Sequence, residues 1–180
     1  SELQKAMTNG IDVILEENIN GEYEKTLEVY NSVVVDLNGH TIDRGMPDRG
    51  GNVIKIDWNG SLTIKDSSPY KSGTITGGFT RSPGGGVYVG QGCTFIMDGG
   101  SIYGNSTMDN DNCQGGGVYV GQGATFTMNG GTINENISTG NGSGVYVADN
   151  STFSFNNNAQ VINNLRQFDD NDYWAEKTEN

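Results

Sequence analysis

The feature that most constrains this chain is an internal repeat. The stretch GGGVYVGQGCTFIMDGG at residues 84–100 returns as GGGVYVGQGATFTMNGG at residues 115–131. A third Val-Tyr-Val triplet starts at Val145, and Ile54-Lys55-Ile56 is a diverged earlier copy. The steps between copies run from 27 to 33 residues, which indicates loops of variable length on a constant scaffold. Because one such repeat cannot bury an apolar face alone, we expect successive copies to stack on one another.

Each repeat contains three short apolar segments separated by turn-forming residues. The first is the Val-x-Val triplet. The second follows eight residues later as Leu62-Thr63-Ile64, Phe95-Ile96-Met97, Phe126-Thr127-Met128 and Phe153-Ser154-Phe155. The third, one or two residues wide, contains Ile75, Ile102, Ile133 or Val161. Apolar residues alternate within the segments, which is typical of strands with one buried face.

Three short strands in each turn of about 27–33 residues predict a parallel β-helix. The segment Leu37-Asn38-Gly39-His40-Thr41-Ile42 matches Met128-Asn129-Gly130-Gly131-Thr132-Ile133 position for position, so the repeat is expected to begin before residue 40. Ile11 to Leu15 read as an opening strand. We therefore expect about five to six coils.

The two ends of a β-helix need covers, because they expose unpaired strand edges and core. Leu3, Ala6 and Met7 fall on one helical face, so the first residues predict a short capping helix with Ser1 as its N-cap. We expect residues 1–165 to form one β-helix with this cap. Residues 166–180, which carry Phe168, Tyr173 and Trp174, are expected to be a C-terminal cap or linker tail.

The chain resembles right-handed parallel β-helix domains of the pectate-lyase-like superfamily, above all the Gly-rich repeat domains of bacterial surface and secreted proteins. Leu37 to Ile42 and the two GGGVYVGQG copies, with their TFxM and GGxI sequels, carry the resemblance over roughly residues 10–165. It implies an all-β, right-handed parallel β-helix in an extracellular or cell-surface setting. Because the superfamily hosts lyases, hydrolases, adhesins and spacers, it does not select an activity.

Charge and hydropathy exclude several classes of partner. The formal net charge is -12, so a nucleic-acid partner is not expected, since phosphate contacts need clustered Lys and Arg. No apolar run approaches the roughly 20 residues that span a bilayer, so membrane insertion is not expected either. A glycan or a protein remains as the partner, and nothing in the sequence indicates an oligomeric state.

Tyr88, Tyr119 and Tyr146 occupy the outward position of the three Val-Tyr-Val triplets. Three tyrosines on successive coils predict an aromatic strip, and the flanking Gly triplets leave it uncovered. One interpretation is a platform that binds sugar rings or the apolar surface of a partner. The other is a cross-strand ladder that stabilises the sheet. The first hypothesis is therefore a non-catalytic domain for carbohydrate or protein binding and adhesion, or a structural spacer.

A carbohydrate-active enzyme, either a polysaccharide lyase or a glycoside hydrolase, is the alternative. Lyases of the superfamily use a basic residue near acidic calcium ligands, and hydrolases use placed carboxylates. The outward strand residues that fit such roles are Asp36, Lys65 and Asp98, together with Lys55. Asp36 and Asp98 fall in different columns, however, and neither has an evident carboxylate partner.

Ice binding is a third hypothesis. Two outward ranks are expected on the second strand, one with Ser61, Thr94, Thr125 and Thr152, the other with Asp36, Thr63, Ile96, Thr127 and Ser154. A flat double rank of Thr resembles the face of some β-helical antifreeze proteins. Thr is also simply a favourable outward residue in strands.

The remaining polar candidates have mostly structural interpretations. Asp109 and Asp111 lie in the longest loop and offer oxygen ligands for calcium, although a solvated acidic loop fits as well. Cys93 aligns with small inward residues and Cys113 lies in a loop, too far away for a disulfide, so two free thiols are expected. Matching asparagines are expected to turn inward as a ladder: Asn105, Asn136 and Asn164.

Overall fold

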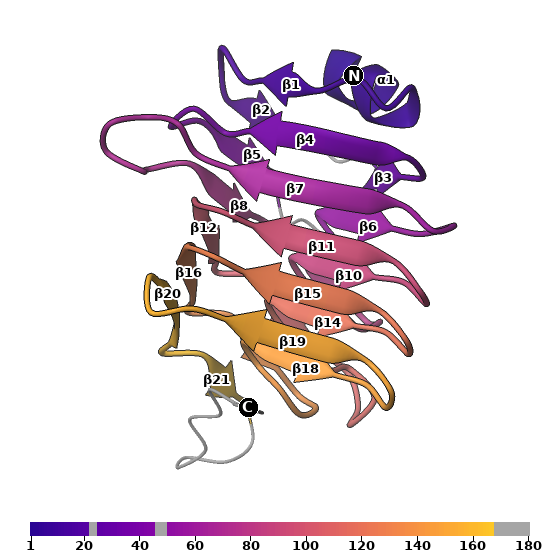
Figure 1. Cartoon of the computed structure of the whole chain (residues 1–180). Helices are drawn as coiled ribbons and strands as arrows, with labels where there is room; N and C mark the ends of the chain where they lie inside the picture. The colour runs from indigo at the N-terminus through magenta and orange to yellow at the C-terminus, as the bar shows by residue number, and fades with distance from the viewer. Residues whose placement is uncertain (22–24, 46–49, 168–180) are drawn as a thin grey trace.

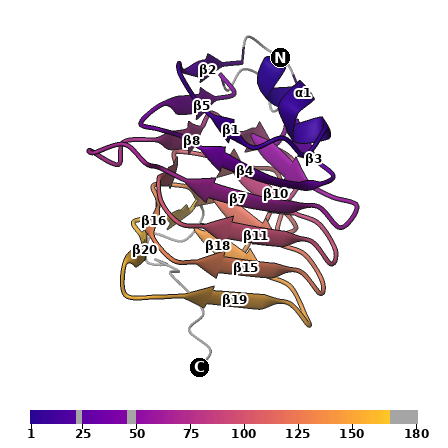
Figure 2. The same cartoon turned by 45° about the horizontal axis from the view of Figure 1, so that its top comes forward.

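The computed structural model describes residues 1–21, 25–45 and 50–167, in which the chain winds into a parallel β-solenoid of about five turns. Figure 1 and Figure 2 show the coils stacked one upon the next, with helix α1 (Glu2–Thr8) at the N-terminal end. Strands of successive coils pair in parallel throughout. The predicted fold class, an all-β parallel β-helix with a short N-terminal helix, is confirmed.

Three of the sheets correspond to the three apolar segments of the repeat. Sheet 1 consists of β3 (Leu27–Val29), β6 (Ile54–Ile56), β10 (Val87–Val89), β14 (Val118–Val120) and β18 (Val145–Val147). Sheet 2 consists of β1 (Val13–Ile14), β4 (Ser32–Asp36), β7 (Ser61–Lys65), β11 (Thr94–Met97), β15 (Thr125–Met128) and β19 (Thr152–Phe155). Sheet 3 consists of β2 (Ile19–Asn20), β5 (Thr41–Asp43), β8 (Thr74–Thr76), β12 (Ser101–Tyr103), β16 (Gly131–Asn134) and β20 (Ala159–Ile162).

A fourth sheet adds a side to the later coils that the apolar pattern does not reveal. Sheet 4 consists of β9 (Phe79–Thr80), β13 (Ser106–Thr107), β17 (Ile137–Ser138) and β21 (Leu165–Arg166). Its strands are two residues long, and their buried side chains are mostly hydroxyls, such as Thr107 and Ser138. Because buried Ser and Thr leave no hydrophobic alternation, sequence reasoning sees only a turn here.

Inward side chains stack in columns that match the predicted repeat. Phe95, Phe126 and Phe153 lie in register in sheet 2, with ring centroids 4.7 and 4.9 Å apart. Ile75, Ile102 and Ile133 form the equivalent column of sheet 3 and are fully buried. These columns form one continuous core, because each coil supplies the apolar surface that its neighbour needs.

One predicted register is wrong. Val35, rather than Leu37, is in register with Met128, through Ile64 and Met97. Ile42 keeps its predicted equivalence with Ile133, so the corner between β4 and β5 holds two extra residues. An Asn-Gly turn occurs in both segments, and this local likeness hides the longer corner.

The asparagine ladder at the corner between sheets 3 and 4 is confirmed. Asn105, Asn136 and Asn164 are buried and are linked from coil to coil. The Oδ1 atom of Asn136 accepts the backbone N–H of Asn105 at 2.9 Å, and Asn164 does the same for Asn136 at 3.0 Å. Each side-chain amide also donates to carbonyls of its own corner and of the preceding coil. The ladder thus satisfies backbone groups that the turn leaves unpaired.

Both cysteines are free thiols, as expected, and both are buried. Cys93 lies at the corner where Ala124 takes the equivalent place, and burial raises the pKa of its thiol. Cys113 is also buried, although sequence reasoning placed it simply in a loop. Its backbone carbonyl accepts a hydrogen bond from the hydroxyl of Thr107 at 2.7 Å, which explains why this part of the loop folds inward.

The two ends of the solenoid differ. Ser1 caps α1 by accepting the N–H of Gln4 at 3.2 Å, and α1 lays Leu3 and Met7 onto the first coils. The expected helical cap is therefore confirmed. At the other end, the expected tail of residues 166–180 begins inside β21, and residues 168–180, with Phe168, Tyr173 and Trp174, lie outside the described residues.

Candidate binding face on sheet 1

The three predicted tyrosines form one continuous stack on the outer face of sheet 1. Tyr88, Tyr119 and Tyr146 are in register and half-buried. Their ring centroids lie 5.3 and 5.4 Å apart, with interplanar angles of 10° and 4°. The rings therefore cover one another's faces, and the row presents ring edges and hydroxyl groups rather than flat ring surfaces. We call this row, together with Lys55, the tyrosine column.

A charged group ends the tyrosine column on its N-terminal side. Lys55 is in register with Tyr88, and its Nζ lies 5.7 Å from the ring centroid. The same Nζ pairs with the carboxylate of Asp57 at 3.0 Å. One coil further, Glu28 is in register with Lys55, and a hydrogen bond to Glu28 raises the pKa of Tyr30 to about 12. The outer face of sheet 1 is thus aromatic at its C-terminal end and carries ion-paired and hydrogen-bonded side chains at its N-terminal end.

Glycines line the edge of the tyrosine column because side chains would not fit there. A Cβ atom at Gly115 would lie 2.9 Å from the Cα of Tyr119, and one at Gly142 would lie 2.7 Å from the Cα of Tyr146. Both glycines also have positive φ angles, +68° and +66°. The chain therefore turns tightly against the strand, and no neighbouring side chain at this position covers the tyrosines.

The hydroxyl groups of the tyrosine column can act as hydrogen-bond donors and acceptors for a ligand. Burial raises the pKa of Tyr119, and the neighbouring Tyr88 and Tyr146 raise it further, so its hydroxyl is neutral at physiological pH. Within the described part of the chain, none of the three hydroxyls has a hydrogen-bond partner. A neutral phenol both donates and accepts, so the column offers a row of polar groups at a spacing set by the coils.

Sequence reasoning missed one exposed aromatic residue beside this face. Trp58 lies in the turn after β6, where Gln91 and Gln122 take the equivalent places in later coils. Its side chain is 77% exposed and its φ is +55°, which is unusual for a bulky residue. The Asp57 carboxylate accepts the N–H of Trp58 at 3.0 Å. The signal that could have found it is the register: a Trp where the repeat has Gln.

The residues weighed for catalysis do not come together as an acid–base pair. Asp36 is buried rather than outward, and it lies in register with Lys65 instead of Thr63. Its Oδ1 accepts the N–H groups of Asn38 and Ser67, both at 2.9 Å. Burial alone would raise the pKa of Asp36, but these hydrogen bonds and the nearby charge of Lys65 outweigh it, so the pKa is lowered. Asp36 is thus engaged in holding a corner.

Asp98 is exposed at the end of β11. Its Oδ1 accepts a hydrogen bond from the side-chain amide of Asn129 at 2.8 Å, one coil further on. This contact ties two successive turns together. Asp98 and Asp36 have different partners and lie two coils apart, but the expectation that they fall in different columns is wrong. Because Val35 aligns with Ile64 and Met97, Asp36 and Asp98 share one column, with Lys65 on the coil between them.

Of the two outward ranks predicted on sheet 2, the first is confirmed and the second differs at its first member. Ser61, Thr94, Thr125 and Thr152 form the first rank. The second rank contains Val34, Thr63, Ile96, Thr127 and Ser154, so Val34 replaces the predicted Asp36. Two apolar residues interrupt this rank, and the sheet has no unbroken double row of hydroxyls.

The loop proposed for calcium carries separate, exposed carboxylates. Asp111 lies 3.7 Å from the guanidinium of Arg166, and the backbone N–H of Asp109 donates to the hydroxyl of Thr139 at 3.3 Å. No group of three or more His, Cys, Asp or Glu side chains suited to a metal ion occurs in the part of the chain that the structure describes. Asp109 and Asp111 therefore lack a third acidic ligand among these residues.

Comparisons with known proteins add no family. No protein-family model matches the chain, and searches of curated proteins and of solved structures give no significant match. The structure thus supports a parallel β-solenoid, whereas membership of the pectate-lyase-like superfamily stays a prediction. Among the described residues, no helix has the length and apolar character needed to cross a membrane.

Proposed function

We propose that this chain is a non-catalytic binding domain of a secreted or cell-surface bacterial protein, and that it binds a carbohydrate chain along the tyrosine column. The observation that carries the proposal is the unbroken, half-exposed stack of Tyr88, Tyr119 and Tyr146 on an outer face. If the column only stabilised the sheet, residues without hydroxyl groups would serve as well.

The geometry favours a ligand that is itself linear and repetitive. Equivalent groups recur at each coil, so a chain that runs along the solenoid axis meets the same contacts several times. Multiple weak contacts of this kind add up to useful affinity. Neutral phenol hydroxyls suit the hydroxyl groups of sugars, and the net charge of -12 disfavours a strongly anionic chain. Trp58 supplies an exposed ring face near the Lys55 end.

The experiment is a glycan-array screen of the whole chain, with and without calcium, followed by affinity measurements on the best ligand. Tyr119→Ala is expected to weaken binding at least tenfold, because it interrupts the column at its centre. Tyr119→Phe keeps the stack but removes one hydroxyl, and it separates hydrogen bonding from stacking. Calcium dependence would direct attention to Asp109 and Asp111.

Tyr103→Ala is the matched control, because Tyr103 is an exposed tyrosine on sheet 3. It should leave the affinity unchanged, and thermal unfolding should show that each variant remains folded. An array without any bound glycan, or binding that survives Tyr119→Ala, would contradict the proposal. The column would then be a stabilising ladder, as in a spacer or a protein-binding domain.

A further inference from the structure

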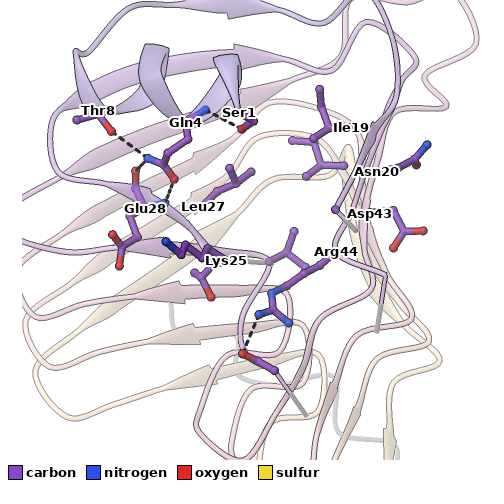
Figure 3. Close-up of a pocket in the computed structure, with 15 residues that line it drawn as sticks. Ser1, Gln4, Thr8, Ile19, Asn20, Lys25, Leu27, Glu28, Asp43 and Arg44 are labelled. Carbon is purple, nitrogen blue, oxygen red and sulfur yellow. Dashed lines mark hydrogen bonds between the residues drawn. The ribbon is translucent and has the colours of Figure 1, made fainter. Parts of the chain in front are cut away.

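A pocket of about 1050 Å³ lies at the N-terminal end of the solenoid, one coil before the Lys55 end of the tyrosine column. Figure 3 shows it bounded by α1 on one side and by residues of β2, β3 and β5 on the others. Its lining combines apolar residues such as Ile19 and Leu27 with the polar side chains of Gln4 and Thr26. Sheet 4 begins only at β9, so the first described coils lack the side that later coils have.

Arg44 brings a buried positive charge to this pocket. It directly follows β5, and Figure 3 shows its side chain with one dashed hydrogen bond. The residue is only 8% exposed. Its Nη2 donates to the carbonyl of Gly50 at 2.7 Å, which engages one of the five N–H donors of a guanidinium.

The rest of this guanidinium is not neutralised by the described residues. Its Nε is buried without a hydrogen-bond partner, and none of the described carboxylates forms an ion pair with Arg44. Burial without such a partner lowers the pKa of Arg44. A buried N–H donor without a partner on a charged group lowers the stability of the folded protein. A ligand with an acceptor group would offset this cost.

Arg44 is also an exception to the repeat. By register, the equivalent residues in later coils are Gly77, Gly104, Glu135 and Asn163, which all have positive φ angles. The later coils use this position for a turn residue with left-handed backbone, whereas Arg44 places a long cationic side chain there without a positive φ. The scaffold therefore does not require it.

The backbone around Arg44 is shaped to its guanidinium. A Cβ atom at Gly50 would lie 2.7 Å from Nη1, and one at Gly51 would lie 3.4 Å from Nη2. Any residue larger than glycine at position 50 would have to displace the guanidinium. Glycine at this place allows the close approach of backbone and cation.

We propose that this pocket binds the carboxylate group of a small ligand through Arg44. A carboxylate matches the planar fork of a guanidinium and would pair with N–H donors that the Gly50 carbonyl leaves free. Lys25, in the same lining, adds a second positive charge. Glu28 and Asp43 also line the pocket, and their charges disfavour a group that concentrates two negative charges on one centre, as phosphate does, more than a carboxylate that carries one. The pocket shares no residue with the tyrosine column, and the proposal does not depend on carbohydrate binding.

The test is an NMR titration of the whole chain with acetate, succinate and inorganic phosphate at constant ionic strength. The buried Nε–H of Arg44 gives a side-chain signal that can be identified by its loss in Arg44→Gln. Acetate and succinate are expected to shift this signal, and Arg44→Gln is expected to reduce their affinity at least tenfold. Gly50→Ala keeps the charge but displaces the guanidinium, so it should also weaken binding severalfold.

Arg81→Gln is the matched control, because it removes the same charge from an exposed residue. It should leave acetate binding unchanged, and so should Tyr119→Ala. Acetate and succinate that shift no pocket signal, or that bind equally to Arg44→Gln, would overturn the proposal. A response to phosphate alone would overturn the assignment to a carboxylate. If Arg44→Gln does not fold, Gly50→Ala decides the question.

Discussion

From β10 onward, the Tyr, Phe and Asn columns carry the same residue on successive coils, whereas before β10 the equivalent positions carry other residues. The later coils stack Phe on Phe in the core, Tyr on Tyr outside and Asn on Asn at a corner. Each identical pair reproduces its contact at the next coil. Regular coils thus derive stability from a single arrangement used repeatedly.

The earlier coils rely on single charged residues that hold individual corners. The Asp66 carboxylate accepts the N–H groups of Gly39 at 2.8 Å and of Gly73 at 2.6 Å. Asp36 acts in the same way at the neighbouring corner. Lys55 stands where later coils have Tyr, and Arg44 where they have turn residues. Longer corners expose backbone donors that no neighbouring coil can pair, and a carboxylate is a strong local acceptor for them.

The difference teaches where specific chemistry can arise in a repeat fold. Positions that stack like on like are constrained by both neighbours, so a change there disturbs two contacts. Irregular coils are free of that constraint. Trp58 and Arg44, the two residues described above as exceptions to the repeat, both occur there. Three predictions test the comparison.

The largest effect is expected for Phe126→Ala, in the centre of the phenylalanine stack. Phe126 is fully buried between Phe95 and Phe153. Removing a ring from such a core costs about 3–5 kcal/mol of unfolding free energy. Phe153→Ala should cost less, because Phe153 is at the last coil and 9% exposed. Chemical denaturation measures both, and equal losses would argue against a stack that depends on two neighbours.

A smaller effect is expected for Asn136→Ala, in the centre of the asparagine ladder. The substitution leaves the N–H of Asn105 and the carbonyl of Ile102 without their present partner. Buried groups left unpaired cost about 1–3 kcal/mol each, and partial relaxation should leave a total of about 2–4 kcal/mol. Asn157→Ala, at an exposed turn, is the control and should change stability by less than about 0.5 kcal/mol.

Asn164→Ala tests the same ladder at its end. Asn164 serves only one neighbouring ladder residue, so its loss should be milder than that of Asn136. If Asn157→Ala and Asn136→Ala had similar effects on the unfolding free energy, the ladder would not contribute to stability as proposed.

The smallest effect concerns the earlier coils and depends on pH. Burial alone would raise the pKa of Asp66, but hydrogen bonds from Ser68, Gly73 and Gly39 lower it below its ordinary value. A lowered folded-state pKa stabilises the protein above the unfolded pKa, near 3.9, and this contribution is lost as pH falls through the folded value. Acidification below about pH 4 should therefore loosen this corner first.

The amide signals of Gly39 and Gly73 report this titration directly, because both N–H groups bind Asp66. Asp66→Asn should lower stability at neutral pH by about 1–2 kcal/mol and flatten its dependence on acid. Asp98→Asn, at an exposed carboxylate, is the matched control. If acid loosened the later coils as early as this corner, the contrast between the two halves would not hold.

Prediction from sequence succeeded where the repeat is strict. The Val-Tyr-Val, Phe and Ile columns, the asparagine ladder, the free cysteines and the helical cap could all be read from spacing. It failed at the corner after β4, where Asn38-Gly39 resembles Asn129-Gly130 but the corner is longer. Sheet 4 escaped because its inward residues are Ser and Thr.

By itself, the sequence determined that this chain stacks short parallel strands into a solenoid with three tyrosines in one outward column. Alternating apolar residues at a recurring spacing leave no other way to bury so many short segments. Only the tertiary structure decided that the tyrosine rings face one another, that Asp36 turns inward and that Arg44 lies beside a pocket without a carboxylate partner among the described residues. These features depend on corner lengths and on groups brought together from different coils, which local sequence patterns do not encode.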